Sequence, residues 1–175
     1  INEADKMIIG DPNPDFFGGL FTSLAYKNWE LSATLNYSVG NEVFNYVRYK
    51  TESMDSYSNQ STAVLERWSA ANTNATLPRI SYGDPTGNTV FSDRWIEDGS
   101  YLRLGQLTLN YDVPPIPGFL KGIGVYLTAT NLFTLTNYSG YDPDFSYVNS
   151  SFYSGVDYGK MPQTKSFIIG LKLDL

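Results

Sequence analysis

The sequence predicts an all-β protein, and more specifically an antiparallel transmembrane β-barrel segment, from three observations. Apolar and polar residues alternate over several stretches of about 11 residues, which is the period of a strand with one apolar and one polar face. The connections between these stretches alternate between short and long, as in outer-membrane barrels. The last stretch alternates up to an apolar final residue, whereas the end of a soluble domain usually frays.

Five segments carry this alternation. They are 16–26, 29–39, 101–111, 123–134 and 165–175. The clearest is 29–39, where every second residue from Trp29 to Val39 is apolar and every residue between them is polar. A lipid-facing side opposite a water-filled lumen produces this pattern, and so does a sheet packed on a soluble core. This strand alone therefore leaves both interpretations open.

Two of the predicted strands are irregular. In 101–111 the apolar side changes from even-numbered residues before Gly105 to odd-numbered residues after it, which predicts a β-bulge near Gly105. In 16–26 the second face also carries apolar residues, Phe17 and Phe21 among them. We expect that face to pack against something inside the barrel.

The connections predict the orientation. Lys27 and Asn28 form a tight turn and 114–122 is a short proline-rich turn, whereas 41–99 and 135–164 are long. A C-terminus on the periplasmic side would place both short turns there and both long segments outside as extracellular loops. Within the first loop a helix is predicted from about Thr62 to Ala70, with Ser61 as its N-cap.

Composition excludes several classes of function. The 175 residues include no Cys and no His, which excludes disulfides, thiol nucleophiles, imidazole bases and His- or Cys-bound metals. The net charge is −6 without a basic patch, so nucleic-acid binding is not expected. No apolar run is long enough for a transmembrane helix. Asp142 and Asp144 are interpreted as turn residues, with a loop calcium ion as the alternative, and we expect no catalysis and no cofactor.

Five strands cannot close a membrane barrel, because even small ones need eight. An open edge would leave unpaired backbone groups in lipid, each at a cost of several kcal/mol. We therefore expect further strands from a longer polypeptide or from additional chains.

Four sequence strings resemble one family in an ordered series. They are GDPNPDF at 10–16 before a YKNW hairpin; RW at 67–68 with NTN at 72–74 and LPR at 77–79; IEDGSYLRL at 96–104; and NLFT at 131–134 with YSGYDP at 138–143. In this order, before an alternating final strand, they resemble the C-terminal barrel portion of a SusC/RagA-family TonB-dependent outer-membrane transporter.

The resemblance implies a function that the residues alone do not. Such transporters have 22-stranded barrels with an N-terminal plug, so residues 1–175 would be the last five strands without the plug. They import large nutrients, oligosaccharides or peptides, across the outer membrane of Gram-negative cells. A SusD-like lipoprotein caps them, and TonB acts through the plug region. Leu175 departs from the family, in which an aromatic last residue is common.

Two sets of residues are candidates for contacts. Aromatic residues of the loops would contact the substrate or the partner: Trp68, Trp95, Tyr141 and Tyr153. The apolar face of the last strand would serve barrel assembly: Phe167, Ile169, Leu171, Leu173 and Leu175. The competing interpretation is a secreted all-β carbohydrate-binding module that uses the same aromatic residues, and a passive porin is a third possibility.

Overall fold

The computed structural model describes residues 3–114, 122–145 and 153–174. The chain divides into two compact units, which we describe separately. The sheet unit consists of Pro14–Gly40, Gly99–Asn137 and Met161–Leu175. The loop unit consists of Ile1–Asn13, Asn41–Asp98 and Tyr138–Lys160.

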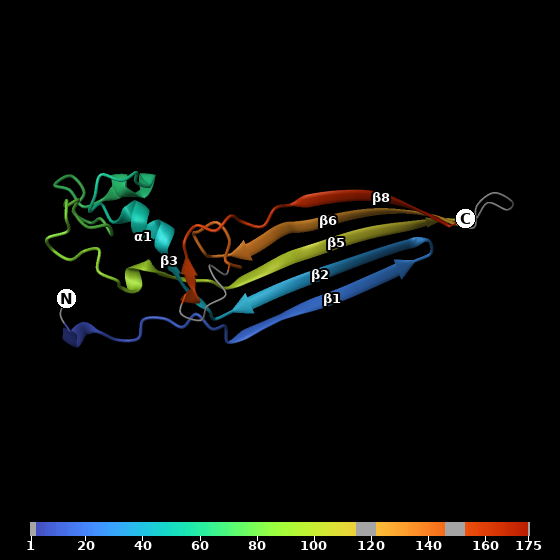
Figure 1. Cartoon of the computed structure of the whole chain (residues 1–175), viewed down its shortest axis with the longest axis horizontal. Helices are drawn as coiled ribbons and strands as arrows, with labels where there is room; N and C mark the ends of the chain where they lie inside the picture. Colours follow the sequence, from blue (N-terminus) through green and yellow to red (C-terminus); the bar gives the residue numbers. More distant parts are fainter. Residues whose placement is uncertain (1–2, 115–121, 146–152, 175) are drawn as a thin grey trace. The chain divides into compact units, whose positions relative to one another are not determined.

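The sheet unit contains one antiparallel sheet of five strands, which confirms the predicted fold class (Figure 1). Its strands are β1 (Phe16–Tyr26), β2 (Trp29–Val39), β5 (Tyr101–Val113), β6 (Gly122–Thr136) and β8 (Ser166–Asp174). They lie in the order β1-β2-β5-β6-β8, so each strand neighbours the next long strand along the chain. The bounds of β1 and β2 equal those of the predicted strands, and β5 and β6 extend two residues further at their C-terminal ends.

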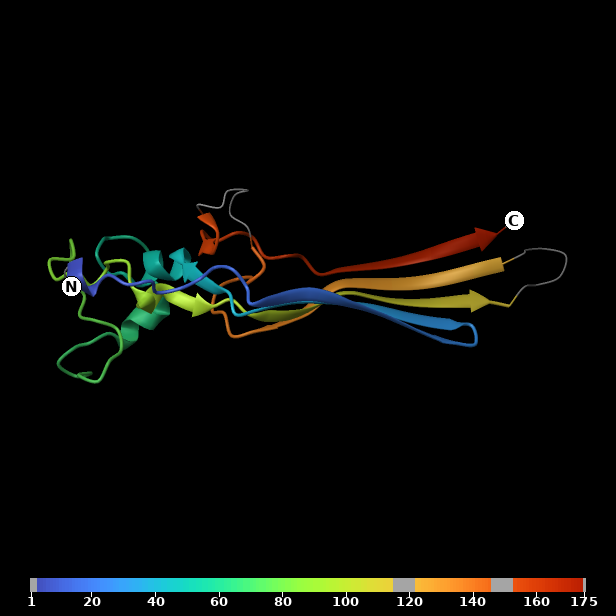
Figure 2. The ribbon, with the colours of Figure 1, turned by 90° about the horizontal axis from the view of Figure 1, so that it is seen from below.

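One face of the sheet is apolar across all five strands. Rows of paired residues build it: Leu24, Leu31, Leu109, Leu127 and Ile169 form one row, and Tyr26, Trp29, Tyr111, Val125 and Leu171 form another. These side chains are largely exposed; Leu24 and Leu171 retain 67% and 69% of their surface. Figure 2 shows the sheet as a single layer, and within the sheet unit no described segment covers this face.

The opposite face of the central strands is polar and is linked by hydrogen bonds between neighbouring strands. Ser23 donates to Glu30 at 2.8 Å, and the hydroxyls of Thr108 and Thr128 lie 3.0 Å apart. Thr130 and Ser166 form a similar hydroxyl pair at 2.6 Å. Cross-strand pairs of this kind stabilise a sheet while they keep one face hydrophilic.

The predicted bulge is confirmed at Gly105. On β2, Thr34 pairs with Gln106 and Leu35 pairs with Leu104, so Gly105 is the extra residue on β5. The pairing of β5 with β6 shifts at the same place. A side chain at Gly105 would lie 2.8 Å from the amide nitrogen of Asn36, which favours glycine. The bulge explains why the apolar face changes from even to odd residue numbers along β5.

The turn between β1 and β2 is fixed by the next strand rather than by a favoured turn pair. Lys27 adopts a left-handed φ of 54°. Asn28 accepts a hydrogen bond from the backbone N–H of Asp112 at 2.8 Å, and its side-chain amide donates to the carbonyl of Asp112 at 2.6 Å. These two bonds tie the hairpin end to β5.

The loop unit contains short elements around a small three-stranded sheet. Its strands lie in the order β4 (Ile96–Asp98), β3 (Glu42–Asn45) and β7 (Val156–Asp157), with β3 antiparallel to β4 and parallel to β7. Its helices are α1 (Tyr46–Glu52) and the 3₁₀ turns η1 (Glu3–Asp5), η2 (Thr62–Glu66) and η3 (Asp93–Trp95). Val43 and Trp95 are its most deeply buried apolar residues.

The predicted helix from Thr62 to Ala70 is wrong in length. Ser61 caps it as expected, accepting from the backbone N–H of Ala63 at 3.2 Å, but the helix is a 3₁₀ turn that ends at Glu66. Beyond it Arg67 is extended, the N–H of Trp68 donates to the carbonyl of Leu77 at 2.9 Å, and Ser69 and Asn72 exchange backbone bonds in a tight turn. This pairing across the loop competes with helical hydrogen bonds that Trp68 would otherwise make.

Candidate functional site

The side chain of Glu97 on β4 joins three segments of the loop unit. Its Oε2 accepts from the backbone N–H of Ser139, and its Oε1 accepts from the Ser139 hydroxyl, each at 2.9 Å. Arg48 on α1 donates to Oε1 at 3.0 Å, and the amide of Asn45 donates to it at 3.2 Å. Burial disfavours the charged carboxylate, but the bonds from Ser139 and Arg48 outweigh burial and lower the pKa of Glu97.

Arg48 connects two carboxylates. Its Nε donates to Glu52 at 3.1 Å, one helical turn along α1, while its Nη1 binds Glu97. Asn45 positions this helix, because its side-chain oxygen caps α1 by accepting from the Arg48 N–H at 2.9 Å. Burial lowers the pKa of Arg48, but the bonds to Glu97 and Glu52 outweigh it, so the pKa is raised. The Arg48 guanidinium therefore binds the carboxylates of both Glu52 and Glu97.

A second buried bond holds the segment that follows β6. The Tyr138 hydroxyl donates to Asp157 at 2.6 Å, and the backbone N–H of Gly159 donates to the same carboxylate at 2.8 Å. Burial and the bond to Asp157 raise the pKa of the Tyr138 hydroxyl, so it remains protonated as a donor. The bond fixes Tyr138 next to Ser139, which is the partner of Glu97.

The structure corrects the expectation for Trp95. Its side chain has no exposed surface, so it cannot stack on a bound molecule. The guanidinium of Arg94 lies 4.3 Å from the centre of its ring, and Tyr49 meets the ring edge-on at 5.3 Å. Trp95 is therefore a packing residue of the loop unit, and its large apolar ring explains why it occupies the interior.

The other three predicted aromatic residues keep exposed surface but do not form one site. Trp68 lines a hollow of mixed polar and apolar character together with Arg79 and Arg94. Tyr141 lines a different hollow, of about 200 Å³, next to Arg48. Tyr153 lies on the rim of neither hollow.

Sequence reasoning missed the charged residues that organise the loop unit, namely Arg48, Arg94 and Glu97. Glu97 lies inside the string IEDGSYLRL, which resembles the family, and this was the feature of the sequence that could have pointed to it. Arg48 and Arg94 had no such signal, because their partners are distant in sequence: Arg48 and Glu97 are separated by 49 residues.

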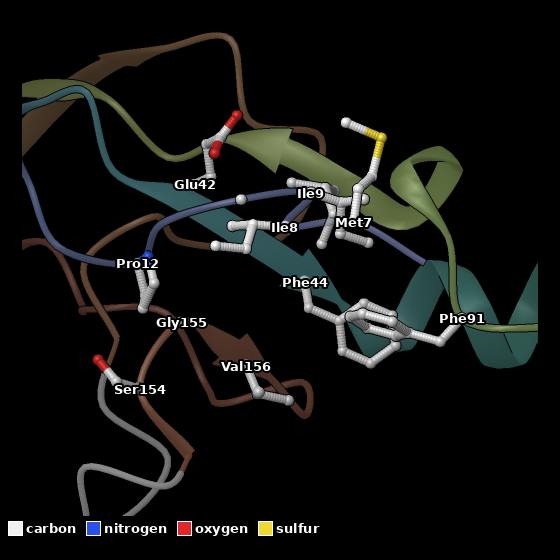
Figure 3. A pocket seen from close by; sticks show the side chains of 12 residues that line it. Met7, Ile8, Ile9, Pro12, Glu42, Phe44, Phe91, Ser154, Gly155 and Val156 are labelled. Atoms are coloured by element: carbon white, nitrogen blue, oxygen red, sulfur yellow. The ribbon is translucent and has the colours of Figure 1, made fainter. Parts of the chain in front are cut away.

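An apolar hollow of about 330 Å³ lies beside β3 (Figure 3). Met7, Ile8 and Ile9 of the N-terminal segment lie over one side, and Phe44 and Phe91 form another with ring centres 4.9 Å apart. The N-terminal segment is held to β3 by the N–H of Glu42, which donates to the carbonyl of Asp11 at 2.8 Å. On another side of the hollow, the N–H of Phe44 donates to the carbonyl of Gly155 at 2.7 Å and holds the residues before β7. The surface is suited to an apolar side chain.

The described residues offer no metal-binding cluster, since no group of three or more acidic side chains converges among them. Asp142 instead accepts from the backbone N–H of Asp144 at 2.9 Å, as its interpretation as a turn residue predicts. No helix in the described part of the chain has the length and apolar character needed to span a membrane.

The predicted assembly residues lie on β8, at one edge of the sheet. Phe167, Ile169, Leu171 and Leu173 point to the apolar face and retain between 57% and 77% of their surface. Leu175 lies outside the described residues. Because β8 has β6 as its one neighbour in the described sheet, its outer edge can accept another strand.

Comparison with known proteins identifies this arrangement, although no family model matches the chain. The chain is 35% identical over 183 residues to TonB-dependent receptor P3 of Formosa agariphila, and 30% identical over 177 residues to TonB-dependent receptor SusC of Bacteroides thetaiotaomicron. In both cases 99% of this chain is matched. Its fold resembles a chain of the RagAB peptide importer in the closed-closed state, with a TM-score of 0.79, 28% identity and 95% of this chain covered.

This chain is a β-barrel segment of a SusC/RagA-family TonB-dependent receptor. It spans 18% of the P3 receptor and 16% of SusC, so most of the length of these two relatives has no counterpart in it. SusC/RagA receptors are outer-membrane β-barrel proteins, and the matched relatives are receptors and importers rather than enzymes.

The family-like strings have structural roles in this receptor segment. In the first string, Asp11 accepts from the backbone and side chain of Asn13 at 2.9 and 2.8 Å. The second string contains the Trp68–Leu77 pairing. The third and fourth strings supply Glu97 and Ser139, which bond to each other. The resemblance covers both units, since the YKNW hairpin and residues 99–104 and 131–134 belong to the sheet unit.

Proposed function

We propose that this chain forms part of the wall and the extracellular loops of an outer-membrane receptor that imports a large nutrient. The observation that carries the proposal is the apolar face that extends over all five strands while the central strands present polar residues on the other side. Such a sheet suits a barrel wall with lipid outside and a watery lumen inside.

The dimensions support a membrane wall. The 11 residues of β2 extend over roughly 36 Å at about 3.3 Å per residue. A tilt of about 40° leaves roughly 28 Å along the membrane normal, which is sufficient for an apolar band about 25 Å tall. At the end of this band Trp29 and Tyr111 pack with ring centres 4.4 Å apart, as residues of an aromatic girdle would.

The edges support a larger barrel. In the described sheet β1 and β8 each pair with one strand, and unpaired backbone groups in lipid would cost several kcal/mol each. Further strands of the same polypeptide would pair with both edges, and a 22-stranded barrel with this chain as its last five strands fits the family. The plug would then lie in the part of the polypeptide outside residues 1–175, and the chain would cross the Gram-negative outer membrane several times.

The competing module would need its apolar face packed beneath a second layer. Within the sheet unit no described segment provides that layer, and the large apolar side chains of β1 and β8 remain exposed. This exposure favours the barrel over a secreted carbohydrate-binding module.

The relatives suggest the cargo and the partners. The family that the sequence resembles implies an oligosaccharide or a peptide, and one similar structure belongs to a peptide importer, so these two classes are the proposed cargo. A SusD-like lipoprotein on the extracellular loops and TonB on the plug region are the proposed partners. The apolar residues of β8 from Phe167 to Leu173 are proposed to guide barrel assembly.

Uptake by cells tests the function. A strain that lacks the full receptor gene should lose uptake of one oligosaccharide or peptide, and the full gene should restore it. Uptake should also stop when the proton-motive force is collapsed, because TonB-dependent import needs energy. Uptake that survives the collapse would indicate a passive porin and contradict the proposal. Purification of the receptor with a lipoprotein attached would test the partner.

A further inference from the structure

A hollow of about 440 Å³ with a mixed polar and apolar lining lies in the loop unit. Its lining includes one aromatic ring, two guanidinium groups and several amide and hydroxyl groups: Trp68, Arg79, Thr86, Asn88 and Arg94. Its volume falls within the range of about 300–1,000 Å³ that small-molecule sites occupy. Trp68 retains 41% of its surface, so its ring is accessible.

Arg94 is the unusual residue of this hollow. Its Nη2 atom is buried without a hydrogen-bond partner, and the described residues supply no ion pair or hydrogen bond to this side chain. The guanidinium carbon lies 4.3 Å from the centre of the Trp95 ring, a contact that satisfies none of its N–H donors. A charged guanidinium without a carboxylate partner is costly in a half-buried place, so an anion bound at the part of Arg94 that lines the hollow would offset that cost.

The carboxylates near Arg94 are already used. Glu52 and Glu97 both bind Arg48, at 3.1 and 3.0 Å. The residues outside the described ranges contain no Asp or Glu, so they provide no further acidic side chain. Burial and the neighbouring charge of Arg48 lower the pKa of Arg94, while Glu52 opposes this effect. The charge of Glu52 therefore acts on Arg94, but its carboxylate is bonded to Arg48 and not to Arg94.

Hydrogen bonds hold another part of the lining, the loop from Asp84 to Thr89, in place. Asp84 accepts from the backbone N–H groups of Asn88 and Thr89, at 2.7 and 2.8 Å, and from the Thr89 hydroxyl at 2.6 Å. The side-chain amide of Asn88 donates to the Thr86 hydroxyl at 2.7 Å. These bonds fix the short loop that brings Thr86 and Asn88 to the hollow, so a ligand would meet polar groups already in place.

We propose that this hollow binds a carboxylate-bearing sugar. Arg94 and Arg79 would bind the carboxylate, because a guanidinium matches it with paired N–H donors. The Trp68 ring would stack on the apolar face of the sugar ring, and Thr86 and Asn88 would bind its hydroxyls. The assignment concerns binding at the cell surface and holds whether or not the bound molecule is imported.

Digalacturonate and its dimethyl ester are suitable probes, since they differ in charge but share the sugar rings. Calorimetry on the purified full-length receptor should show that the acid binds at least tenfold more tightly than the ester. Arg94→Gln should weaken binding of the acid by about ten- to a hundredfold, because it removes charged hydrogen bonds. Arg67→Gln removes the same charge from the same unit outside the hollow and should change binding less than twofold.

Two further variants keep the test decisive if Arg94→Gln fails to fold. Arg79→Gln should weaken binding of the acid but not of the ester, and Trp68→Ala should weaken both. Equal binding of acid and ester to the wild-type receptor would overturn the proposal. A second pair of results would also overturn it. The wild type would fail to bind the acid, and ligand-free Arg94→Gln would unfold at a much lower temperature than Arg67→Gln. These results would show that another part of the receptor pairs with Arg94.

Discussion

Ser139 donates both its backbone N–H and its hydroxyl to the side chain of Glu97, each at 2.9 Å. The two residues are 42 positions apart, and the bonds join the segment after β6 to the strand β4. Arg48 adds α1 to the same carboxylate. The side chain of Glu97 thus joins three segments of the loop unit. We therefore expect the loss of Glu97 to affect the loops strongly.

Replacing Glu97 with alanine should loosen the loop unit. The change leaves Arg48 with one carboxylate and removes the acceptor of the Ser139 N–H, at a cost of about 1–3 kcal/mol in local stability. Hydrogen exchange on the full-length receptor should then show faster exchange at Ser139 and in α1. Glu66→Ala is the control, because Glu66 is an exposed acidic residue of the same unit. Similar exchange in both variants would contradict the role of Glu97.

Acidification should have the same effect as the loss of Glu97. The pKa of Glu97 is lower in the folded protein than its ordinary value of 4.5, so its charged form stabilises the fold. That stabilisation is complete above pH 4.5 and is lost as the pH falls through the lowered pKa. Exchange at Ser139 should therefore accelerate below pH 4.5 beyond its intrinsic pH dependence. Glu97→Gln should abolish this additional acceleration, and its persistence would assign the effect to another group.

The sequence and the structure agree best where the information is local. The strand from Trp29 to Val39 alternates without an exception, and the register at Gly105 follows from a change in parity, so neither needs knowledge of distant residues. Side-chain period alone decides which face each residue occupies.

The loop unit was far less predictable. Trp95 is buried because Arg94 and Tyr49 pack against its ring, and the sequence does not indicate these contacts. The α1 helix has seven residues, too few to form stably in isolation, so it depends on the Asn45 cap and on the Arg48 ion pairs. The 3₁₀ turn ends at Glu66 because the N–H of Trp68 bonds to the carbonyl of Leu77, and no sequence periodicity indicates this bond.

Deleting Gly105 should disrupt the sheet more than substituting it. The deletion removes the extra residue, so one half of β5 must present its apolar side chains to the lumen. Gly105→Ala places a methyl group near the Asn36 amide, which is the end of a flexible side chain and can move. We expect the deletion to abolish assembly of a heat-modifiable barrel in outer membranes and the alanine variant to retain most of it. Normal assembly of the deletion variant would show that the bulge does not set the register.

A pair of arginine substitutions tests which face of β2 meets lipid. Leu35 lies on the apolar face and pairs with Leu20 and Leu104, whereas Asn36 is the next residue and lies on the polar face. Leu35→Arg should cost roughly 2–4 kcal/mol if its side chain sits near the bilayer midplane, because the charge must be buried in hydrocarbon. Asn36→Arg should be milder, since its side chain reaches the watery lumen. Equal costs for the two variants, measured by reversible folding of the full receptor into lipid vesicles, would contradict the assignment of the faces. A reversed order would place lipid on the side that carries Asn36, and the barrel wall would then have to be inverted.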